Sequence, residues 1–360
     1  MLPFDSLFID ETRRGTKIKT DDYLASGTYS IVDQGQSLIA GYTNLKEGVF
    51  YDVPAIIFGD HTRAIKYIDE PFFLGADGTK ILKSKDGQTN GKYLYYALRA
   101  AKIPNLGYSR HFKCLKELKF KTHSRNEQDK IVTILDNISK QIDSNNQKIK
   151  QLDELVKARF VEMFDMGSYP IKPLSEIAEY WNGLTYKPSD VSSDGIIVLR
   201  SSNIQDMQLD LDDIVRVKCE INDKKMVKPN DILMCSRNGS AKLVGKVALI
   251  PELEEAMSFG AFMMIIRSEY YPYLMTYFQL PAFRSQISTG TTTINQITRY
   301  MLDKVLLPVP DMEKVNEFKA FVAQVDKSKF ALSNELAMCN FYVRLVHDRV
   351  MHGRIDLRVS

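Results

Sequence analysis

The sequence predicts an α+β protein in which two β-rich domains alternate with two long α-helices that pair as an antiparallel coiled coil with pseudo-twofold symmetry. Three observations predict this fold class: two long segments lack glycine and proline, both carry an apolar repeat in steps of four and three, and the second repeat follows the first at a constant distance. We expect a first domain at 1–123, a long helix at 124–166, a second domain at 167–310, a second long helix at 311–353 and a C-terminal tail at 354–360.

The first long helix is predicted by the stretch 131–156. Apolar residues recur there in steps of four and three, and Asn145 takes the one remaining position of the pattern. This spacing is typical of the seam of a coiled coil. Because neither glycine nor proline occurs from 108 to 166, the helix can continue for about 40 residues, or roughly 60 Å. The apolar seam positions are Ile131, Leu135, Ile138, Ile142, Ile149, Leu152 and Val156.

The second long helix repeats this seam 187 residues later. Cys339 behaves as a small apolar residue at its seam position, and only Lys329 breaks the pattern. Two such helices in one chain can pair with each other, and the long domain between them allows antiparallel pairing. Helix-start signals stand before both segments, at Ser124 with Glu127 and at Asp311. The repeated apolar positions are Phe318, Val322, Val325, Leu332, Leu336 and Val343.

The two domains before these helices contain short apolar runs between glycine, proline, aspartate and asparagine, a pattern that indicates β-strands and turns. VPAIIF and KYLYYAL are examples in the first domain, and GIIVL, DILMC and GKVALI in the second. The start of the first domain, PFDSLFIDETRRG, is similar to PIKPLSEIAEYWNG at an offset of about 168. Because the helices are offset by 187, the second domain carries an insertion of roughly twenty residues.

Composition indicates a globular protein with a small net charge, +3 from 48 basic and 45 acidic residues. Any anion-binding surface must therefore be local. The four cysteines are scattered without metal-ligand spacing, so we expect reduced thiols. The start of the chain lacks the pattern of a signal peptide, and no apolar run reaches the roughly 18 residues that a membrane span needs. We expect a cytoplasmic protein that does not bind membranes.

This architecture itself suggests a partner. A rod that carries one domain at each end presents two similar but different surfaces at a fixed separation. DNA has a matching symmetry and a fixed repeat of about 34 Å per turn. The alternative is a coiled-coil assembly or tethering protein whose end domains bind protein or another ligand.

Several sequence blocks resemble the specificity (S) subunit of type I restriction-modification enzymes. The block with most weight is FGDHTRAIKYIDEPFFLGADGTKIL at 58–82, followed by YSRHFKCLKELKFKTHSRNEQDKIVTILDNI. In the second half, VLRSSNI, DILMCSRNGSAKLVGK and LLPVP are similar to the family's strand and loop blocks. Two positions depart from the family pattern: His123 replaces a proline before the first helix, and Lys314 with Val315 replaces Glu-Gln at the second.

The resemblance implies two target-recognition domains on a helical spacer and no catalytic centre in this chain. It implies binding of double-stranded DNA at a bipartite, asymmetric sequence, one half per domain. It also implies that the chain scaffolds two modification subunits that methylate adenine, and that restriction subunits join them to cut DNA in an ATP-dependent reaction. S-adenosylmethionine, ATP and Mg²⁺ would belong to those partners.

In the first domain, basic and histidine side chains at three places are candidates for DNA contact. Arginine can bond the O6 and N7 atoms of guanine, and lysine can neutralise phosphate. The alternative for the GDHTRAIK segment is a tight turn in which Asp60 and Thr62 satisfy backbone groups, and we favour this alternative for Asp60. The charges near the N-terminus and at 110–130 can equally be solvated. The candidates are Arg13, Arg14, Lys17, His61, Arg63, Arg110 and His111.

In the second domain, the segments LRSSN and SRNGSAK supply the corresponding candidates. Asparagine can pair with the N6 and N7 atoms of adenine, and arginine with guanine. The alternative for Asn238 and Asn203 is that their side chains bond backbone groups of a turn. Gln296 and Arg299 are weaker candidates. The main candidates are Arg200, Ser201, Asn203, Ser236, Arg237, Asn238 and Lys242.

Two enzymatic patterns fail on closer inspection. The stretch GSAKLVGKV has a spacing one residue too long for a phosphate-binding loop and has Val247 where a magnesium ligand must stand. Asp311 with Glu317 and Lys319 is similar to a nuclease pattern, but these residues open a predicted coiled-coil helix, where Asp311 is a capping residue.

Overall fold

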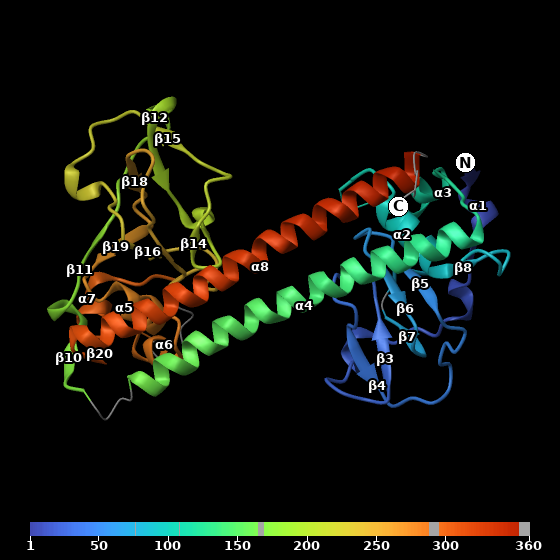
Figure 1. The fold of residues 1–360 in the computed structure, drawn as a ribbon, viewed down its shortest axis with the longest axis horizontal. Helices are drawn as coiled ribbons and strands as arrows, with labels where there is room; N and C mark the ends of the chain where they lie inside the picture. Colours follow the sequence, from blue (N-terminus) through green and yellow to red (C-terminus); the bar gives the residue numbers. More distant parts are fainter. Residues whose placement is uncertain (76, 108, 165–168, 288–294, 353–360) are drawn as a thin grey trace, which may run out of the picture. The chain divides into compact units, whose positions relative to one another are not determined.

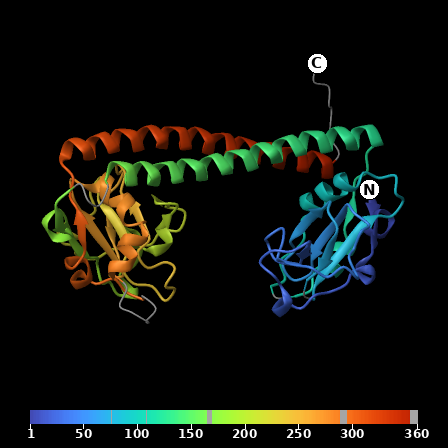
Figure 2. The ribbon, with the colours of Figure 1, turned by 90° about the horizontal axis from the view of Figure 1, so that it is seen from below.

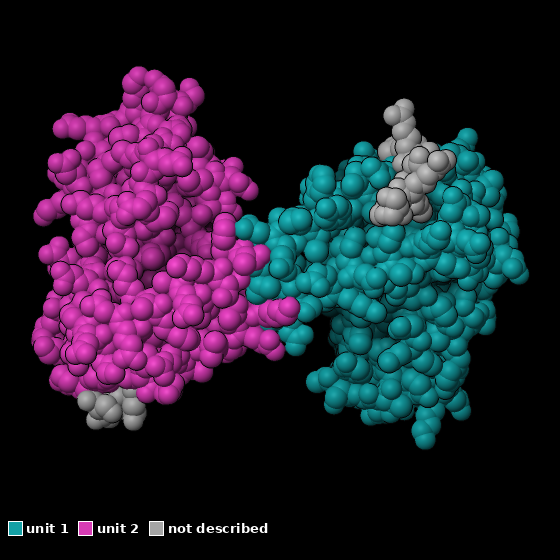
Figure 3. All heavy atoms as spheres, in the orientation of Figure 1, with its two compact units in different colours: residues 1–147, 332–360 teal, residues 148–331 magenta. Residues whose placement is uncertain are grey.

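The computed structural model describes residues 1–75, 77–107, 109–164, 169–287 and 295–352 (Figure 1). The predicted C-terminal tail at 354–360 lies outside the described residues. The chain forms two compact units (Figure 3). The first unit is Met1–Gln147 with Leu332–Ser360, and the second unit is Lys148–Ala331. Each unit therefore combines sheets with one part of each long helix.

The first unit contains a four-stranded antiparallel sheet of order β2-β8-β5-β6 and a three-stranded sheet of order β4-β3-β7, in which β3 and β7 run parallel. A short antiparallel pair, β1 with β9, completes it. The strands are β1 (Leu2–Pro3), β2 (Phe8–Asp10), β3 (Tyr29–Val32), β4 (Gly41–Thr43), β5 (Ala55–Gly59), β6 (Ile65–Ile68), β7 (Phe72–Leu74), β8 (Thr79–Ser84) and β9 (Lys119–Phe120). The helices are α1 (Phe4–Leu7), α2 (Gly91–Ala100) and α3 (Phe112–Lys116), with 3-10 turns η1 (Thr12–Arg14) and η2 (Thr20–Asp22).

The second unit repeats this topology strand for strand. Its four-stranded antiparallel sheet has the order β11-β19-β16-β17, and its three-stranded sheet has the order β15-β12-β18 with β12 and β18 parallel. The pair β10 with β20 corresponds to β1 with β9. The predicted internal repeat is therefore confirmed at the level of topology. The predicted insertion contains one extra hairpin, β13 with β14, between β12 and β15.

The strands of the second unit are β10 (Ile171–Pro173), β11 (Glu179–Asn182), β12 (Val191–Leu199), β13 (Ile204–Gln205), β14 (Gln208–Leu209), β15 (Arg216–Val217), β16 (Ile232–Cys235), β17 (Val247–Leu249), β18 (Met257–Phe259), β19 (Met263–Arg267) and β20 (Leu306–Pro308). The helices are α5 (Tyr271–Tyr277), α6 (Pro281–Ile287) and α7 (Arg299–Asp303). The 3-10 turns are η3 (Leu174–Glu176), η4 (Pro188–Asp190), η5 (Ser201–Asn203) and η6 (Asp223–Lys225).

The two long helices are α4 (Arg125–Met163) and α8 (Met312–His352), close to the predicted spans. The Glu127 carboxylate accepts from the backbone N–H of Ser124 at 2.9 Å, and Asp311 Oδ1 accepts from the N–H of Lys314 at 2.9 Å. Both contacts satisfy backbone donors that a helix start leaves unpaired. The predicted capping residues therefore do mark where the helices begin.

In each unit, the parts of α4 and α8 lie side by side and run along one side of the sheets (Figures 1 and 2). In the first unit, Ile131 and Leu135 of α4 are buried in a core that includes Val343 and Val346 of α8. In the second unit, the rings of Phe160 and Phe318 lie 5.6 Å apart in the core. Rising numbers in α4 meet falling numbers in α8, so the pairing is antiparallel, as predicted.

The predicted seam residues are all buried or half-buried, and the two polar seam positions have partners on the opposite helix. Asn145 is fully buried; its Nδ2 atom donates to Glu335 Oε2 at 2.9 Å and its Oδ1 atom accepts from Gln141 Nε2 at 3.1 Å. Lys329 Nζ lies 2.6 Å from Asp153 Oδ1. These contacts explain how the seam accommodates one amide and one ammonium.

We expect Asn145→Leu to raise the free energy of unfolding by about 1 kcal/mol, because a leucine fills the seam and the partner Glu335 is itself exposed to water. Asn145→Ala, which leaves a gap instead, should lower it. Urea unfolding of the two variants and the unchanged chain measures the difference. A leucine variant less stable than the unchanged chain would show that the amide contacts stabilise the seam.

Candidate nucleic-acid interface

Most of the candidate contact residues lie on loops that follow the carboxyl ends of three strands in each unit. Parallel neighbours end at the same sheet edge, so the loops after β3 and β7 are adjacent, as are those after β12 and β18. We call residues 33–36, 60–64, 75, 77, 78, 110 and 111 the first loop cluster. Residues 200–203, 236–242, 260–262 and 295–297 form the second loop cluster.

The same backbone bonds close both clusters. Asp60 N–H donates to Gly78 O at 2.7 Å, and Ser236 N–H donates to Phe262 O at 2.9 Å. The carbonyl of Asp60 accepts from the N–H of His111, and the carbonyl of Ser236 accepts from the N–H of Ile297 at 2.7 Å. The two loop clusters therefore share a backbone plan while their side chains differ.

His111 holds the first loop cluster together from inside the protein. It is fully buried, its Nε2 atom accepts from Leu106 N–H at 3.1 Å and its Nδ1 atom donates to Asp60 O at 3.0 Å. Asp60 Oδ1 in turn accepts from Phe112 N–H at 2.7 Å. The expectation that His111 contacts DNA is therefore corrected, because both ring nitrogens bond backbone groups. The turn role favoured for Asp60 agrees with these contacts.

Gln34 joins the loops of the first loop cluster and was not singled out from the sequence. Its Oε1 atom accepts from His61 N–H at 3.2 Å, its Nε2 atom donates to Asp77 O at 3.0 Å, and its carbonyl accepts from the Thr62 hydroxyl. The only local signal was the Asp-x-Gly turn in which Asp33 Oδ1 accepts from Gly35 N–H at 2.8 Å. The partners of Gln34 lie in distant segments.

Three basic candidates of the first unit, Lys17, Arg63 and Arg110, occupy different settings. Lys17 Nζ lies 2.5 Å from Asp77 Oδ1 at the surface, and this hydrogen bond lowers the pKa of the Asp77 carboxyl. Arg110 is exposed beside this pair. Arg63 is half-buried, has a backbone φ of 60° and donates to Ile103 O at 3.1 Å. Its guanidinium thus ties a turn to a neighbouring loop, which leaves Lys17 and Arg110 as the more accessible cations.

Arg13 and Arg14 lie on η1, away from the first loop cluster. Arg14 bonds Asp52 at 2.8 Å, and its guanidinium lies 5.5 Å from the centre of the Phe50 ring. Asp52 precedes β5, whereas the loop cluster follows the end of that strand. Because Arg14 is exposed, its contact with DNA stays a prediction. Arg13 is exposed on the same turn.

Two candidates of the second unit serve the fold. Asn203 is buried; its Oδ1 atom accepts from Arg200 N–H at 2.9 Å, and its Nδ2 atom donates to the carbonyls of Asp210 and Asp213. Ser236 is buried, and its hydroxyl donates to Phe262 O at 2.9 Å. The expectation that these two side chains contact bases is corrected, because their polar atoms satisfy backbone groups.

The remaining candidates of the second loop cluster lie at its surface. Asn238 Nδ2 donates to Ser201 Oγ at 3.1 Å, which joins the loop after β16 to the turn after β12. Arg200 donates to Asp213 Oδ2 at 2.8 Å. Arg237 and Lys242 are exposed. Of the weaker candidates, Gln296 forms a backbone bridge to Arg237, while Arg299 lies on α7 with its guanidinium 6.0 Å from the centre of the Tyr180 ring.

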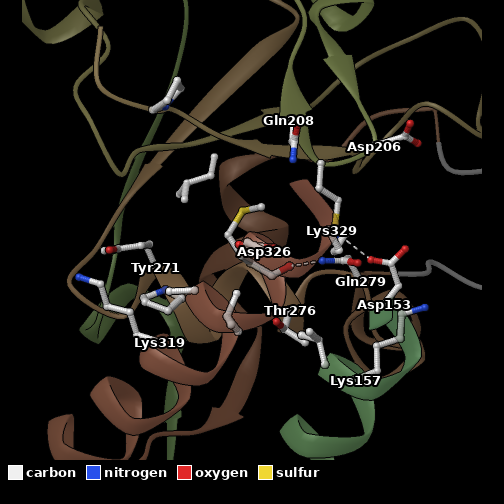
Figure 4. Close-up of a pocket in the computed structure, with 18 of the residues that line it drawn as sticks. Asp153, Lys157, Asp206, Gln208, Tyr271, Thr276, Gln279, Lys319, Asp326 and Lys329 are labelled. Carbon is white, nitrogen blue, oxygen red and sulfur yellow. Dashed lines mark hydrogen bonds and ion pairs between the residues drawn. The ribbon is translucent and has the colours of Figure 1, made fainter. Parts of the chain in front are cut away.

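A separate pocket of about 470 Å³ lies in the second unit between α4, α5, α8 and the β13–β14 hairpin (Figure 4). Apolar side chains such as Met207 and Val322 line it, and Lys329 with Asp153 pairs at its rim. Its charged lining residues balance, with three lysines (157, 319 and 329) and three aspartates (153, 206 and 326). The pocket therefore lacks the positive charge that a phosphate site needs, and no candidate DNA contact lines it.

The residues of the rejected nuclease pattern have structural partners. Asp311 caps α8, and Glu317 pairs with Lys314 at 2.7 Å and with Arg159 at 3.2 Å. Among the described residues, no group of three or more histidine, cysteine, aspartate or glutamate side chains could hold a metal ion. A search of the same residues finds no helix with the length and apolar character of a membrane span.

Comparison with known proteins finds similarity to one family over part of the chain. Residues 8–154 match the model of the type I restriction modification DNA specificity domain. The specificity subunit of the type I restriction enzyme StySPI from Salmonella potsdam is 29% identical over 174 residues, which cover 44% of this chain and 37% of that protein. That of EcoKI from Escherichia coli K12 is 28% identical over 173 residues, with the same coverage.

A solved structure extends the likeness to nearly the whole chain. The S subunit of a type I restriction-modification system from M. genitalium has a TM-score of 0.56 at 16% sequence identity, over 98% of this chain and 96% of that one. At this identity the likeness concerns the fold. The predicted resemblance to type I specificity subunits is confirmed, by the sequence match over residues 8–154 and by the fold over nearly the whole chain.

Proposed function

We propose that this chain is the DNA-recognition subunit of a type I restriction-modification complex and reads a bipartite, asymmetric sequence. The observation that carries the proposal is the repeated topology. Each unit presents loops at the same strand ends, and the exposed side chains of those loops differ, with Arg110 in the first unit, beside the Lys17–Asp77 pair, and Arg237 and Lys242 in the second. One backbone plan with two sets of side chains suits two different half-sites.

The chain would contribute recognition and assembly rather than chemistry. Its partners would be two modification subunits, which methylate adenine with S-adenosylmethionine, and restriction subunits, which use ATP and Mg²⁺ to cleave DNA. The complex would work in the cytoplasm, where DNA is accessible. The family match to a DNA specificity domain and the fold shared with an S subunit support this proposal.

The alternative, a tethering protein whose end domains bind other ligands, makes a different prediction about salt. For a DNA reader that neutralises phosphates, the logarithm of the binding constant falls linearly with the logarithm of salt concentration, with a slope of about −0.9 per phosphate contact. Binding of labelled duplexes across a salt titration separates the two functions. A chain without a negative slope, alone and with modification subunits present, would be a tether.

Replacing residues 168–310 by the corresponding domain of a relative should change one half of the methylated sequence and leave the other half unchanged. The reason is that the exchanged loops belong to one cluster only. The measurement is methylation sequencing of DNA from cells that express the hybrid with a compatible modification subunit. The unchanged chain is the control, and a change in both halves would contradict the modular proposal.

Arg237→Ala should weaken target binding by about 1–3 kcal/mol and relax specificity at one base position, as expected for an arginine at a base edge. Lys242→Ala should weaken binding equally to all sequences and reduce the salt slope by about one, as expected for a phosphate contact. Competition binding against single-base variants of the target measures both. Lys218→Ala, which removes an exposed lysine paired with Asp194 at 3.0 Å, is the matched control.

Two adjacent residues of the first loop cluster should respond in opposite ways. His111→Ala should lower the free energy of unfolding by roughly 2–3 kcal/mol, because a cavity forms, the Leu106 N–H loses its acceptor and the Asp60 carbonyl loses a donor. Arg110→Ala should leave stability within about 0.5 kcal/mol and weaken DNA binding. Thermal unfolding and duplex binding, measured on both variants, test this pair. A stable His111 variant with weaker DNA binding would restore histidine as a contact residue.

A further inference from the structure

The second loop cluster presents an aromatic side chain that the sequence pattern did not single out. Phe262 stands between β18 and β19 and is 60% exposed. Its carbonyl oxygen accepts from the N–H of Ser236 at 2.9 Å, from the N–H of Arg237 at 3.1 Å and from the Ser236 hydroxyl at 2.9 Å. These three hydrogen bonds fix the backbone of Phe262, which holds its ring at the surface.

Arg237 lies over this ring. The carbon at the centre of its guanidinium is 5.4 Å from the ring centre, within the range of a cation–π contact. Gln296, on the fourth segment of the second loop cluster, forms a backbone bridge to Arg237. The bridge fixes the backbone of Arg237 and the Phe262 ring orients its guanidinium, so less side-chain freedom is lost when the guanidinium binds a partner.

The first loop cluster has no counterpart to this pair. The position that corresponds to Phe262, defined by the bond from Asp60 N–H to its carbonyl, is Gly78 with a φ of +89°. Nothing in the shared backbone plan therefore requires a ring at this place. The aromatic residue is a property of the second loop cluster alone, as expected for a residue that distinguishes one half-site from the other.

The chemistry of the pair fits two neighbouring base pairs in the major groove. Arginine is the preferred partner of the guanine O6 and N7 atoms, and an apolar side chain can contact the methyl group of thymine. The Arg237 guanidinium and the Phe262 ring lie 5.4 Å apart, which is less than the span of two base-pair steps of about 3.4 Å each. The two side chains can therefore contact neighbouring base pairs. Replacing the guanine by adenine would remove the contact of Arg237, and replacing the thymine by a pyrimidine without a methyl group would remove that of Phe262.

We propose that Arg237 and Phe262 form one base-reading element for a thymine next to a guanine, with Arg237 on the guanine edge and Phe262 against the thymine methyl group. This inference rests on the proposed function and adds the identity of two neighbouring bases in the half-site that the second unit reads. Phe262 acts both as a contact and as the surface that positions the guanidinium.

The test uses duplexes that carry the methylated sequence of this chain, in which each thymine of the half-site read by the second unit is replaced in turn by deoxyuridine. Deoxyuridine lacks only the 5-methyl group. For the unchanged chain, one replacement beside a guanine should weaken binding about fourfold, the equivalent of roughly 0.8 kcal/mol for one buried carbon group. Phe262→Ala should weaken binding to the thymine duplex by a similar factor and should not distinguish thymine from deoxyuridine.

Two further variants separate contact from positioning. Phe262→Leu keeps an apolar side chain and should retain sensitivity to deoxyuridine, while its discrimination at the guanine falls because leucine offers no ring face to Arg237. Tyr300→Ala is the matched control. It removes another exposed ring of the second unit that carries a cation, Lys304 Nζ at 4.1 Å from its centre, and it should change neither affinity nor base preference.

The outcomes distinguish this inference from the proposed function. If the unchanged chain, with modification subunits present, binds no duplex sequence-specifically, the proposed function fails and the base-reading element fails with it. If sequence-specific binding holds but Phe262→Ala keeps the deoxyuridine penalty, or no thymine in the half-site is sensitive, only the base-reading element is wrong. Thermal unfolding of each variant confirms that a loss of binding is not a loss of fold.

Discussion

The pairing of α4 with α8 is the interaction on which the rest of the structure depends. Exposing the apolar seam of either helix to water would cost free energy, and within each unit the opposite helix covers the seam. The seam is also continuous with the domain cores. Ile131 and Leu135 share a core with Phe58 of the first unit, and Phe160 and Phe318 share one with Tyr273 of the second. The sheets and the helix pair therefore fold as one body within each unit.

This coupling explains how two recognition surfaces can diverge without loss of the scaffold. The loop clusters lie at strand ends, and the backbone bonds that close them use carbonyl and N–H groups that every residue except proline supplies. Side chains that point away from these bonds can change freely. The exchange of Gly78 in one unit for Phe262 in the other, at the same bonded position, illustrates such a change.

Sequence reasoning predicted the helices well because their signals are local or periodic. Absence of glycine and proline gave their spans, and Glu127 and Asp311 marked their starts. Sequence reasoning could not predict the partners of Asn145 and Lys329, because they are distant in the sequence. Glu335 lies 190 residues from Asn145, and Asp153 lies 176 residues from Lys329.

The candidate site was predicted less completely, for a physical reason. Side chains that can bond a base can equally bond a buried backbone group, and the choice depends on burial, which the local pattern does not encode. His111, Asn203 and Ser236 bond backbone groups in this way. Phe262 escaped notice for the opposite reason, because an apolar residue beside the buried run of β19 has the pattern of a core residue.

The central claim is that each unit recognises its own half of a DNA sequence. The most direct measurement is the affinity of the chain, with modification subunits present, for duplexes that carry both half-sites, either half-site alone or neither, at one salt concentration. The account predicts that each half-site adds its own increment of binding free energy, and that the two increments sum to roughly that of the complete sequence. Equal affinity for the complete sequence and for one half-site alone would contradict it.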